Sequence, residues 1–220
     1  MIGKGVVLCI TVVIPLAILI YAIYKKRFIP FLLGVIAFVV SQVLLRIPLI
    51  TYLQTESSQY QQWSVSNPIL MILLLSFSAG LFEEIARFIA MRFFMKQRDV
   101  LSGLVFGVGH GGIEAFLLVG LATILSVASV VGMETYLLTG LERALAIVTH
   151  ICLSLIVLRA VQHQQFNKVW LAIMIHGLLN STVTIVGHFS TIWLAEIAFL
   201  VFTITLILFT YFFIRKEGFK

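Results

Sequence analysis

The stretch IGKGVVLCITVVIPLAILIYAIY (residues 2–24) decides the fold class, because it is almost wholly apolar and long enough for a membrane helix. Such a helix needs about 20 consecutive apolar residues to cross the hydrocarbon core of a bilayer. The basic cluster KKR (25–27) follows directly, and no polar cleavage region precedes it. We therefore expect this run to be a retained membrane helix and not a cleaved signal peptide.

The rest of the chain has the same character. Of its 220 residues, 61% are hydrophobic and only 11% are charged, and the mean hydropathy is +1.12. A soluble domain usually has about a quarter of its residues charged, and a chain of this length has too little interior to hide so much apolar surface from water. The composition predicts an all-α polytopic membrane protein, with residues 1–220 forming a single transmembrane domain.

The apolar runs predict about seven transmembrane helices. The third begins at Pro68, and proline is favoured in the first helical turn. The fourth is too long for a straight crossing and is rich in glycine, so we expect it to be tilted, broken or closely packed. We expect the polar segment 51–67 to be the main outer loop. The predicted spans are residues 2–24, 30–50, 68–95, 101–131, 135–158, 169–188 and 190–214.

The net charge of +6 does not indicate nucleic-acid binding, because most basic residues gather in short segments between apolar runs. This distribution follows the positive-inside rule of membrane proteins. It predicts an N-terminus outside the membrane and a C-terminus in the cytosol. Cys9 and Cys152 lie within apolar runs and do not indicate a disulfide framework.

A set of polar and ionisable residues lies inside the predicted spans. A charge at the bilayer centre costs at least about 2.5–3.5 kcal/mol, so such residues usually pair with one another and mark a functional site. Glu196 is the member for which the sequence offers no partner, and we expect no functional role for it. The set comprises Glu83, Glu84, Arg87, His110, Glu114, Glu142, Arg143, His150, His176, Asn180 and Glu196.

Spacing and depth predict that this set forms one buried site. Residues four apart share a helix face, and three pairs have this spacing: Glu83 with Arg87, His110 with Glu114, and His176 with Asn180. At about 1.5 Å of rise per residue, four of the helices carry an ionisable group roughly 12–18 Å from the nearest basic boundary. These groups are Glu84, His110, His150 and His176.

The residue types suit hydrolysis of an amide bond. Adjacent helical residues differ in direction by about 100°, so one of Glu83 and Glu84 is expected to face the site. A carboxylate beside a histidine can deprotonate water, and another histidine with an asparagine can stabilise an oxyanion. Arg87 is expected to keep the catalytic carboxylate ionised.

The same residues offer a second interpretation as a metal site. His110, His150 and His176 with Glu84 would form a histidine-rich zinc site with an open position. We favour a metal-free mechanism, because the compact H-E-x-x-H spacing of many zinc proteases is absent from the sequence. Zinc remains the alternative cofactor.

Four short runs resemble the YhfC family of intramembrane proteases, which are relatives of PrsW and of the type II CAAX prenyl endopeptidases. The runs are FEEIAR (82–87), FGVGHGGIE (106–114), ERALAIVTH (142–150) and HGLLN (176–180), and the resemblance covers about residues 80–185.

The resemblance implies roles for the residues of these runs. Glu83 would be the base, His110 would help to activate water, and His176 with Asn180 would stabilise the oxyanion. Arg87 follows the glutamate pair one residue sooner than in the E-E-x-x-x-R motif of the CAAX-type enzymes, which leaves open which glutamate it supports. Family members are described both as glutamic-type and as metal-dependent proteases, so the cofactor also stays open.

The sequence thus predicts an intramembrane endopeptidase that cleaves a membrane-associated peptide or protein substrate. Its catalytic core would lie at about residues 68–188, around a hydrophilic cavity open to the cytosol, with Glu142 and Arg143 supporting His150. Two other functions remain as alternatives. One is a proton-coupled transporter, because intramembrane acid–histidine chains also relay protons. The other is a catalytically silent membrane scaffold.

Overall fold

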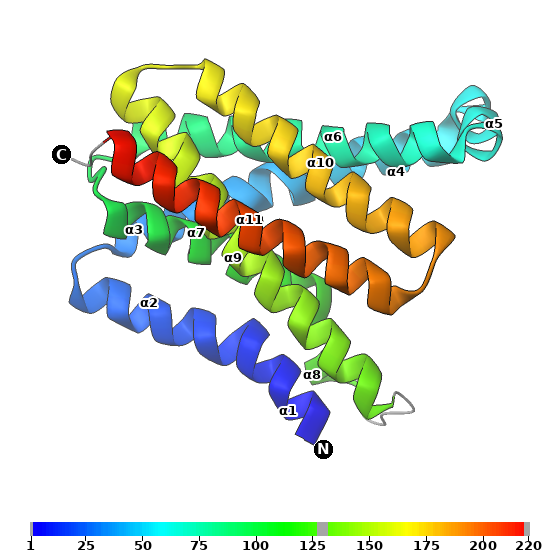
Figure 1. The fold of residues 1–220 in the computed structure, drawn as a ribbon, viewed down its shortest axis with the longest axis horizontal. Helices are drawn as coiled ribbons and strands as arrows, with labels where there is room; N and C mark the ends of the chain where they lie inside the picture. The colour runs from blue at the N-terminus through cyan, green and yellow to red at the C-terminus, as the bar shows by residue number, and fades with distance from the viewer. Residues whose placement is uncertain (1, 127–131, 218–220) are drawn as a thin grey trace.

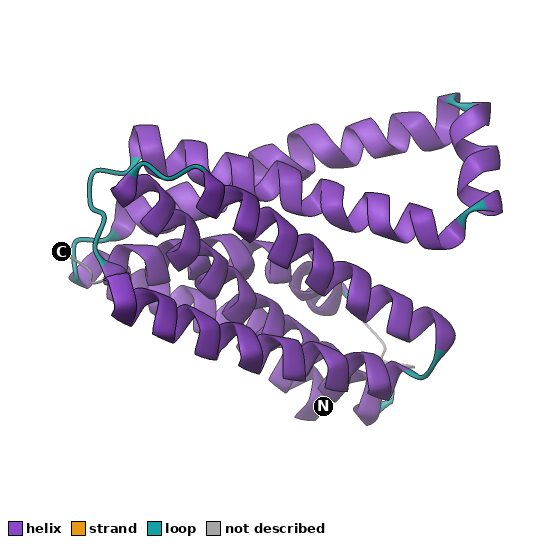
Figure 2. Ribbon diagram, turned by 45° about the horizontal axis from the view of Figure 1, so that its top comes forward, coloured by secondary structure: helices purple, strands orange, loops and turns teal. Residues whose placement is uncertain are grey.

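A computed structural model describes residues 2–126 and 132–217, and nearly all of these residues are helical (Figures 1 and 2). Seven helical segments within these ranges are long and apolar enough to cross a membrane. This confirms the prediction of an all-α polytopic membrane protein. The elements are α1 (Ile2–Leu8), η1 (Cys9–Val13), α2 (Ile14–Tyr24), α3 (Phe28–Phe38), η2 (Val39–Arg46), α4 (Ile47–Glu56), α5 (Ser58–Ser66), α6 (Pro68–Ile89), η3 (Ala90–Phe94), α7 (Val100–Ala115), η4 (Phe116–Gly120), α8 (Leu121–Leu125), α9 (Met133–His163), α10 (Asn167–Phe189) and α11 (Ile192–Glu217).

The elements labelled η are π-helical stretches inside longer helices. Two of them, η1 and η2, directly precede helices that have a proline in their first turn, Pro15 in α2 and Pro48 in α4. Proline has no N–H to donate, and its ring clashes with the carbonyl four residues earlier. A wider turn before the proline removes this conflict, so the membrane crossing continues through it.

The segment 51–67 is not the loop that the sequence predicts. The helix α4 continues to Glu56, and α5 forms a further short helix at Ser58–Ser66. Ser57 caps α5, because its side chain accepts a hydrogen bond from the Tyr60 N–H at 3.2 Å. The prediction was wrong because it took polarity as a sign of a loop, although polar residues behind a good cap form helix readily. Pro68 does open α6, as expected.

The fourth predicted span is a helix with a π-helical stretch, α7–η4–α8, which ends at Leu125. The last part of the predicted range, 127–131, lies outside the described residues. Close packing accounts for the glycines of α7. A Cβ on Gly107 would lie 2.5 Å from the Cα of Ile151 in α9. A Cβ on Gly34 of α3 would lie 2.9 Å from the backbone nitrogen of His110 in α7. Glycine therefore allows α3, α7 and α9 to approach backbone to backbone.

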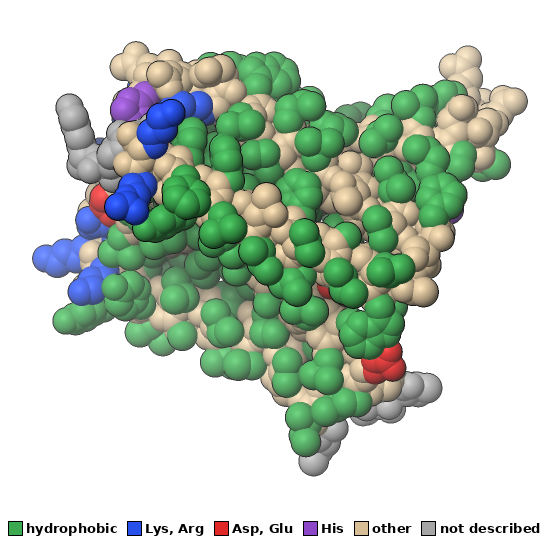
Figure 3. Space-filling view, viewed as in Figure 1, with side chains coloured by type: hydrophobic (Ala, Val, Ile, Leu, Met, Phe, Trp, Pro, Cys, Tyr) green, Lys and Arg blue, Asp and Glu red, His purple; other side chains and the backbone are tan. Residues whose placement is uncertain are grey.

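The two ends of the bundle differ in charge. Lysine and arginine side chains gather at one end, at the left of Figure 3, where the connections 25–27, 95–99 and 164–166 lie. We call this the basic end, and we call the end that carries α5, at the right of Figure 1, the α5 end. The largest apolar core fills the half of the bundle nearer the basic end, with Met91, Phe106, Leu153, Ile156 and Val161 among its members.

Candidate active site

Three helices bring Glu83, His110 and His150 together in the middle of the bundle. The Nε2 atom of His110 lies 2.9 Å from Oε2 of Glu83, and Nδ1 of His150 lies 3.9 Å from the same oxygen. The centroids of the two imidazole rings are 4.7 Å apart, and all three side chains are buried. The close contacts of the α7 glycines with α3 and α9 are what allow these groups to meet.

The neighbouring carboxylate, Glu84, belongs to a second group. Its Oε1 atom lies 2.9 Å from Nδ1 of His176, and its Oε2 atom lies 3.4 Å from Nε of Arg87. Adjacent residues of one helix point in different directions, so Glu83 and Glu84 serve different partners, as the sequence predicts. The His176 ring is 5.4 Å from that of His150, which links the two groups.

Arg87 holds His150 as well as Glu84. Its Nη1 donates to the His150 carbonyl at 2.9 Å and to Oγ of Ser154 at 3.1 Å, and its Nη2 lies 3.0 Å from Nδ1 of His150. A guanidinium can only donate, so Nδ1 of His150 accepts and the ring proton resides on Nε2. The ion pair of Arg87 is with Glu84, three residues away, and not with Glu83, the partner that the four-residue spacing suggests.

Glu114, Arg143 and Glu142 extend the network from His150 along α7 and α9. The Oε2 atom of Glu114 lies 2.6 Å from Nε2 of His150, and its Oε1 atom lies 3.3 Å from Nη1 of Arg143. Arg143 also donates to Glu142. The predicted pair on α7 does not form, because His110 turns to Glu83 and Glu114 turns to His150. Arg143 reaches His150 through Glu114.

Sequence reasoning missed Gln42, which lies in η2. Its Nε2 atom donates to Oε1 of Glu83 at 2.5 Å, and its Oε1 atom accepts from Nη1 of Arg46 at 3.0 Å. Glu83 therefore has Gln42 on one oxygen and His110 on the other. A signal was present in the sequence, because Gln42 and Arg46 are polar, four apart and inside an apolar run.

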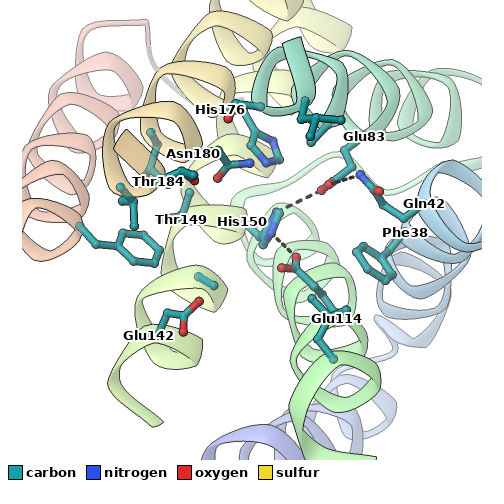
Figure 4. A pocket seen from close by; sticks show the side chains of 18 of the residues that line it. Phe38, Gln42, Glu83, Glu114, Glu142, Thr149, His150, His176, Asn180 and Thr184 are labelled. Carbon is teal, nitrogen blue, oxygen red and sulfur yellow. Dashed lines mark hydrogen bonds and ion pairs between the residues drawn. The ribbon is translucent and has the colours of Figure 1, made fainter. Parts of the chain in front are cut away.

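A polar cavity of about 470 Å³ begins at this cluster (Figure 4). Glu83, His150, His176 and Asn180 line it, whereas His110 is fully buried behind Glu83. Asn180 lies beside His176 on α10 (Figure 4). The histidine that meets the cavity next to Glu83 is therefore His150 and not the expected His110.

The cavity extends toward the α5 end, where residues such as Ile72 of α6 and Val183 and Thr184 of α10 form its walls. The apolar core closes the bundle on the other side, toward the basic end. The cavity therefore does not open at the basic end, the end that the sequence prediction took for the cytosolic side. The prediction used the depth of the ionisable groups but had no information on which side of them the apolar side chains would pack.

The donor atoms of the cluster suit a metal ion. One ligand atom each from Glu83, His110 and His150 lie within 4.8 Å of one another, and two histidines with one glutamate are a donor set of catalytic zinc sites. The Nδ1 atom of His110 is buried without a hydrogen-bond partner among the described residues. His150 contacts Arg87 through one ring nitrogen and Glu114 through the other, so ligation would replace one of these contacts.

This set differs from the one expected from the sequence. Glu84 and His176 were expected to take part, but they face each other, and Glu84 also faces Arg87. Glu83 takes the place of Glu84 because it is the glutamate that α6 directs at His110.

Fold and site together define a polytopic membrane protein with a buried acid–histidine cluster at the head of a polar cavity. The sequence profile described as "YhfC intramembrane metalloprotease" matches residues 10–135 and 124–199. The chain belongs to the YhfC family.

One relative and the solved structures complete the comparison. The chain is 55% identical over 47 residues to the "Uncharacterized membrane protein YhfC" of Bacillus subtilis (strain 168). The aligned part is 21% of this chain and 18% of that protein, so it spans only a small part of the relative. No solved structure matches the chain.

Proposed function

We propose that this chain is an intramembrane endopeptidase that hydrolyses a peptide bond of a membrane-associated substrate with water activated at Glu83. One observation carries the proposal: Glu83 lies between two histidines at the inner end of a polar cavity in a largely apolar bundle. A carboxylate held in this way can take a proton from water. The family description as an intramembrane metalloprotease supports the same class of reaction.

The residues around Glu83 and along the cavity are assigned separate roles in this reaction. Gln42 and His110 hold the two oxygens of Glu83, so the carboxylate is oriented before substrate arrives. His176 uses Nδ1 for Glu84, which leaves its Nε2 for the substrate, and Asn180 adds an amide donor in the same wall. Preorganised donors of this kind stabilise the oxyanion that forms when water adds to the carbonyl carbon.

The reaction ends when the C–N bond breaks and the amine leaves with a proton. His150 lines the cavity and its Nε2 lies beside Glu114, and we assign proton delivery to this pair. Glu84 and Arg87 act as positioning residues for His176 and His150. The catalytic core proposed at about 68–188 also includes η2, because Gln42 contacts the base.

A metal ion of the kind that the family description implies would be held by Glu83, His110 and His150. A zinc ion held there would lower the pKa of a water molecule bound to it to about 7. Elemental analysis of active protein distinguishes a metal-dependent mechanism from a glutamic mechanism that needs no metal. One zinc per chain that is lost in His110→Ala assigns the metal form, whereas full activity after chelation without zinc assigns the glutamic form.

The basic end is proposed to lie in the cytosol, following the positive-inside rule. The N-terminus and the cavity would then face the outer side of the membrane. The substrate would reach Glu83 from that side, either through the cavity mouth at the α5 end or between helices that line the cavity.

The proposal is tested by comparing the membrane peptides of cells that express the wild type, Glu83→Gln or Glu196→Gln at matched levels. Glu196 is a buried carboxylate of α11 outside the cavity lining, so it serves as the control. We expect cleavage products with the wild type and the control and none with Glu83→Gln. Identical peptides in all three would overturn the proposal and favour the transporter.

A further inference from the structure

Arg46 of η2 places a positive charge on the wall of the polar cavity. It is half-buried, and its three hydrogen bonds all go to neutral acceptors. Nε donates to Oγ of Ser78 at 3.0 Å, Nη2 donates to the Leu75 carbonyl at 2.7 Å, and Nη1 donates to Gln42. These contacts with α6 fix the guanidinium before any ligand binds.

The Arg46 guanidinium still has N–H groups that can bind an anion. It carries five N–H groups, so three hydrogen bonds leave two N–H groups for another acceptor. The two carboxylates of the candidate active site already have other partners. Glu83 accepts from Gln42 and faces His110, and Glu114 faces His150 and Arg143. Arg143, another arginine on the cavity wall, is paired with Glu114 and Glu142.

The position of Arg46 relates it to the substrate. Gln42 links Arg46 to the base directly, since it contacts Arg46 through Oε1 and Glu83 through Nε2. The two hydrogen bonds, 3.0 and 2.5 Å long, and the one amide group between them span at most about two residues of extended peptide, at roughly 3.3–3.6 Å per residue. The wall around Arg46 is apolar, with Ile47, Ile72 and Leu75.

We propose that Arg46 forms a subsite for a carboxylate of the substrate, about two residues from the bond that is cleaved and beside apolar side chains. A guanidinium binds a carboxylate through charge-assisted hydrogen bonds that can be bidentate, and these are about twice as strong as hydrogen bonds between neutral groups. The subsite adds a substrate preference to the proposed function, and its role in cleavage depends on that function. The carboxylate has two sources: an acidic side chain, or the free C-terminus of the substrate.

The test uses the full-length protein in lipid nanodiscs and fluorescently labelled apolar peptides as probes. One set carries a glutamate at successive positions of one apolar sequence, and its matched set carries glutamine at the same positions. Every peptide is made with a free-acid and with an amidated C-terminus. Binding is measured by fluorescence anisotropy, and cleavage of the same peptides by mass spectrometry.

We expect the peptides with the recognised carboxylate to bind at least about tenfold more tightly than their neutral partners, as expected for hydrogen bonds to a charged group. A preference confined to glutamate identifies an acidic side chain, and one confined to the free-acid form identifies a C-terminus. Arg46→Gln should abolish the preference. Ser78→Ala, which removes one contact of Arg46 and not its charge, should keep it.

Equal binding of charged and neutral peptides by the wild type overturns the subsite, and this result does not depend on the folding of any variant. Arg46→Lys provides a second variant that keeps the charge without the planar fork, and it should retain part of the preference. The two proposals fail separately. Cleavage without a carboxylate preference removes the subsite alone, whereas a preference without any cleavage removes the peptidase function alone.

Discussion

Removing Arg87 should destabilise the bundle strongly, and removing Glu84 at the same time should restore much of the loss. Both side chains are fully buried, with Nε of Arg87 3.4 Å from Oε2 of Glu84. Arg87→Met leaves the Glu84 carboxylate without its cation, and the loss of one partner of a buried pair costs about 3–5 kcal/mol. We expect a value near the lower limit, because His176 still contacts Glu84.

The double variant Arg87→Met, Glu84→Gln removes both charges. Together with the two single variants it forms a double-mutant cycle, which gives the coupling free energy between the two side chains. Groups in contact within one network couple by about 0.5–3 kcal/mol, and burial places this pair in the upper half of that range. The free energy of unfolding is measured by detergent-induced unfolding in mixed micelles, with tryptophan fluorescence as the signal. Single costs that add to within about 0.5 kcal/mol in the double variant would refute a direct interaction between the two charges.

Three further predictions concern other contacts of the structure. Gln42→Leu should lower kcat for peptide cleavage about tenfold or more with the fold retained, because Glu83 loses a charge-assisted hydrogen bond; an unchanged kcat would show that Gln42 does not position the base. Gly107→Ala should destabilise the protein by about 1–3 kcal/mol, since its Cβ would meet the α9 backbone. Gly5→Ala, where a Cβ meets nothing within 4 Å, should be neutral or stabilising in the same unfolding assay, and equal effects would contradict the proposed helix contact. Partial burial raises the pKa of Asp99, but hydrogen bonds from Ser102 and Arg27 outweigh this effect and hold the pKa below its usual 3.8. The stability that Asp99 contributes is therefore present above pH 3.8 and is lost as the pH falls below that value. The loss of unfolding free energy in Asp99→Asn should thus become smaller on acidification, and a loss that becomes larger would reverse the assigned sign.

The fold class follows from sequence because each crossing requires a long apolar run, and residues 2–24 and 190–214 contain little else. The ends of the helices follow less well. Residues 51–56 continue α4, and residues 58–66 form α5 behind the cap at Ser57, so the polarity of this segment does not indicate a loop. The seven-helix count survived these errors because it depends only on the apolar centres of the runs.

The meeting of a glutamate of α6 with His110 and His150 also follows from sequence, because groups at one depth on neighbouring helices are brought together by packing, although the depth argument named Glu84 and the observed glutamate is Glu83. Their individual partners do not follow. Residues four apart share a face, but each can turn to a different neighbouring helix, as His110 turns to α6 and Glu114 turns to α9. Gln42 was missed for a related reason: its partner is distant in sequence, and one neutral polar residue in an apolar run gives a weak signal.

The direction of the cavity could not be predicted from sequence either. The side on which a buried site opens depends on where large apolar side chains fill the bundle, and these are present throughout the spans. In the structure Phe106, Leu153 and Ile156 pack on the side of the basic end and leave the other side hollow. This arrangement emerges only when all the helices are packed together.

In the proposed reaction, water activated at Glu83 cleaves a peptide bond inside this bundle. The most direct measurement incubates the purified protein in nanodiscs with membrane peptides in ¹⁸O-labelled water and follows the label by mass spectrometry. We expect ¹⁸O in the new C-terminal carboxylates with the wild type and with Glu196→Gln, and none with Glu83→Gln. Labelled products at equal rates in all three proteins would contradict the role of Glu83, and intact peptides in all three would contradict the peptidase itself.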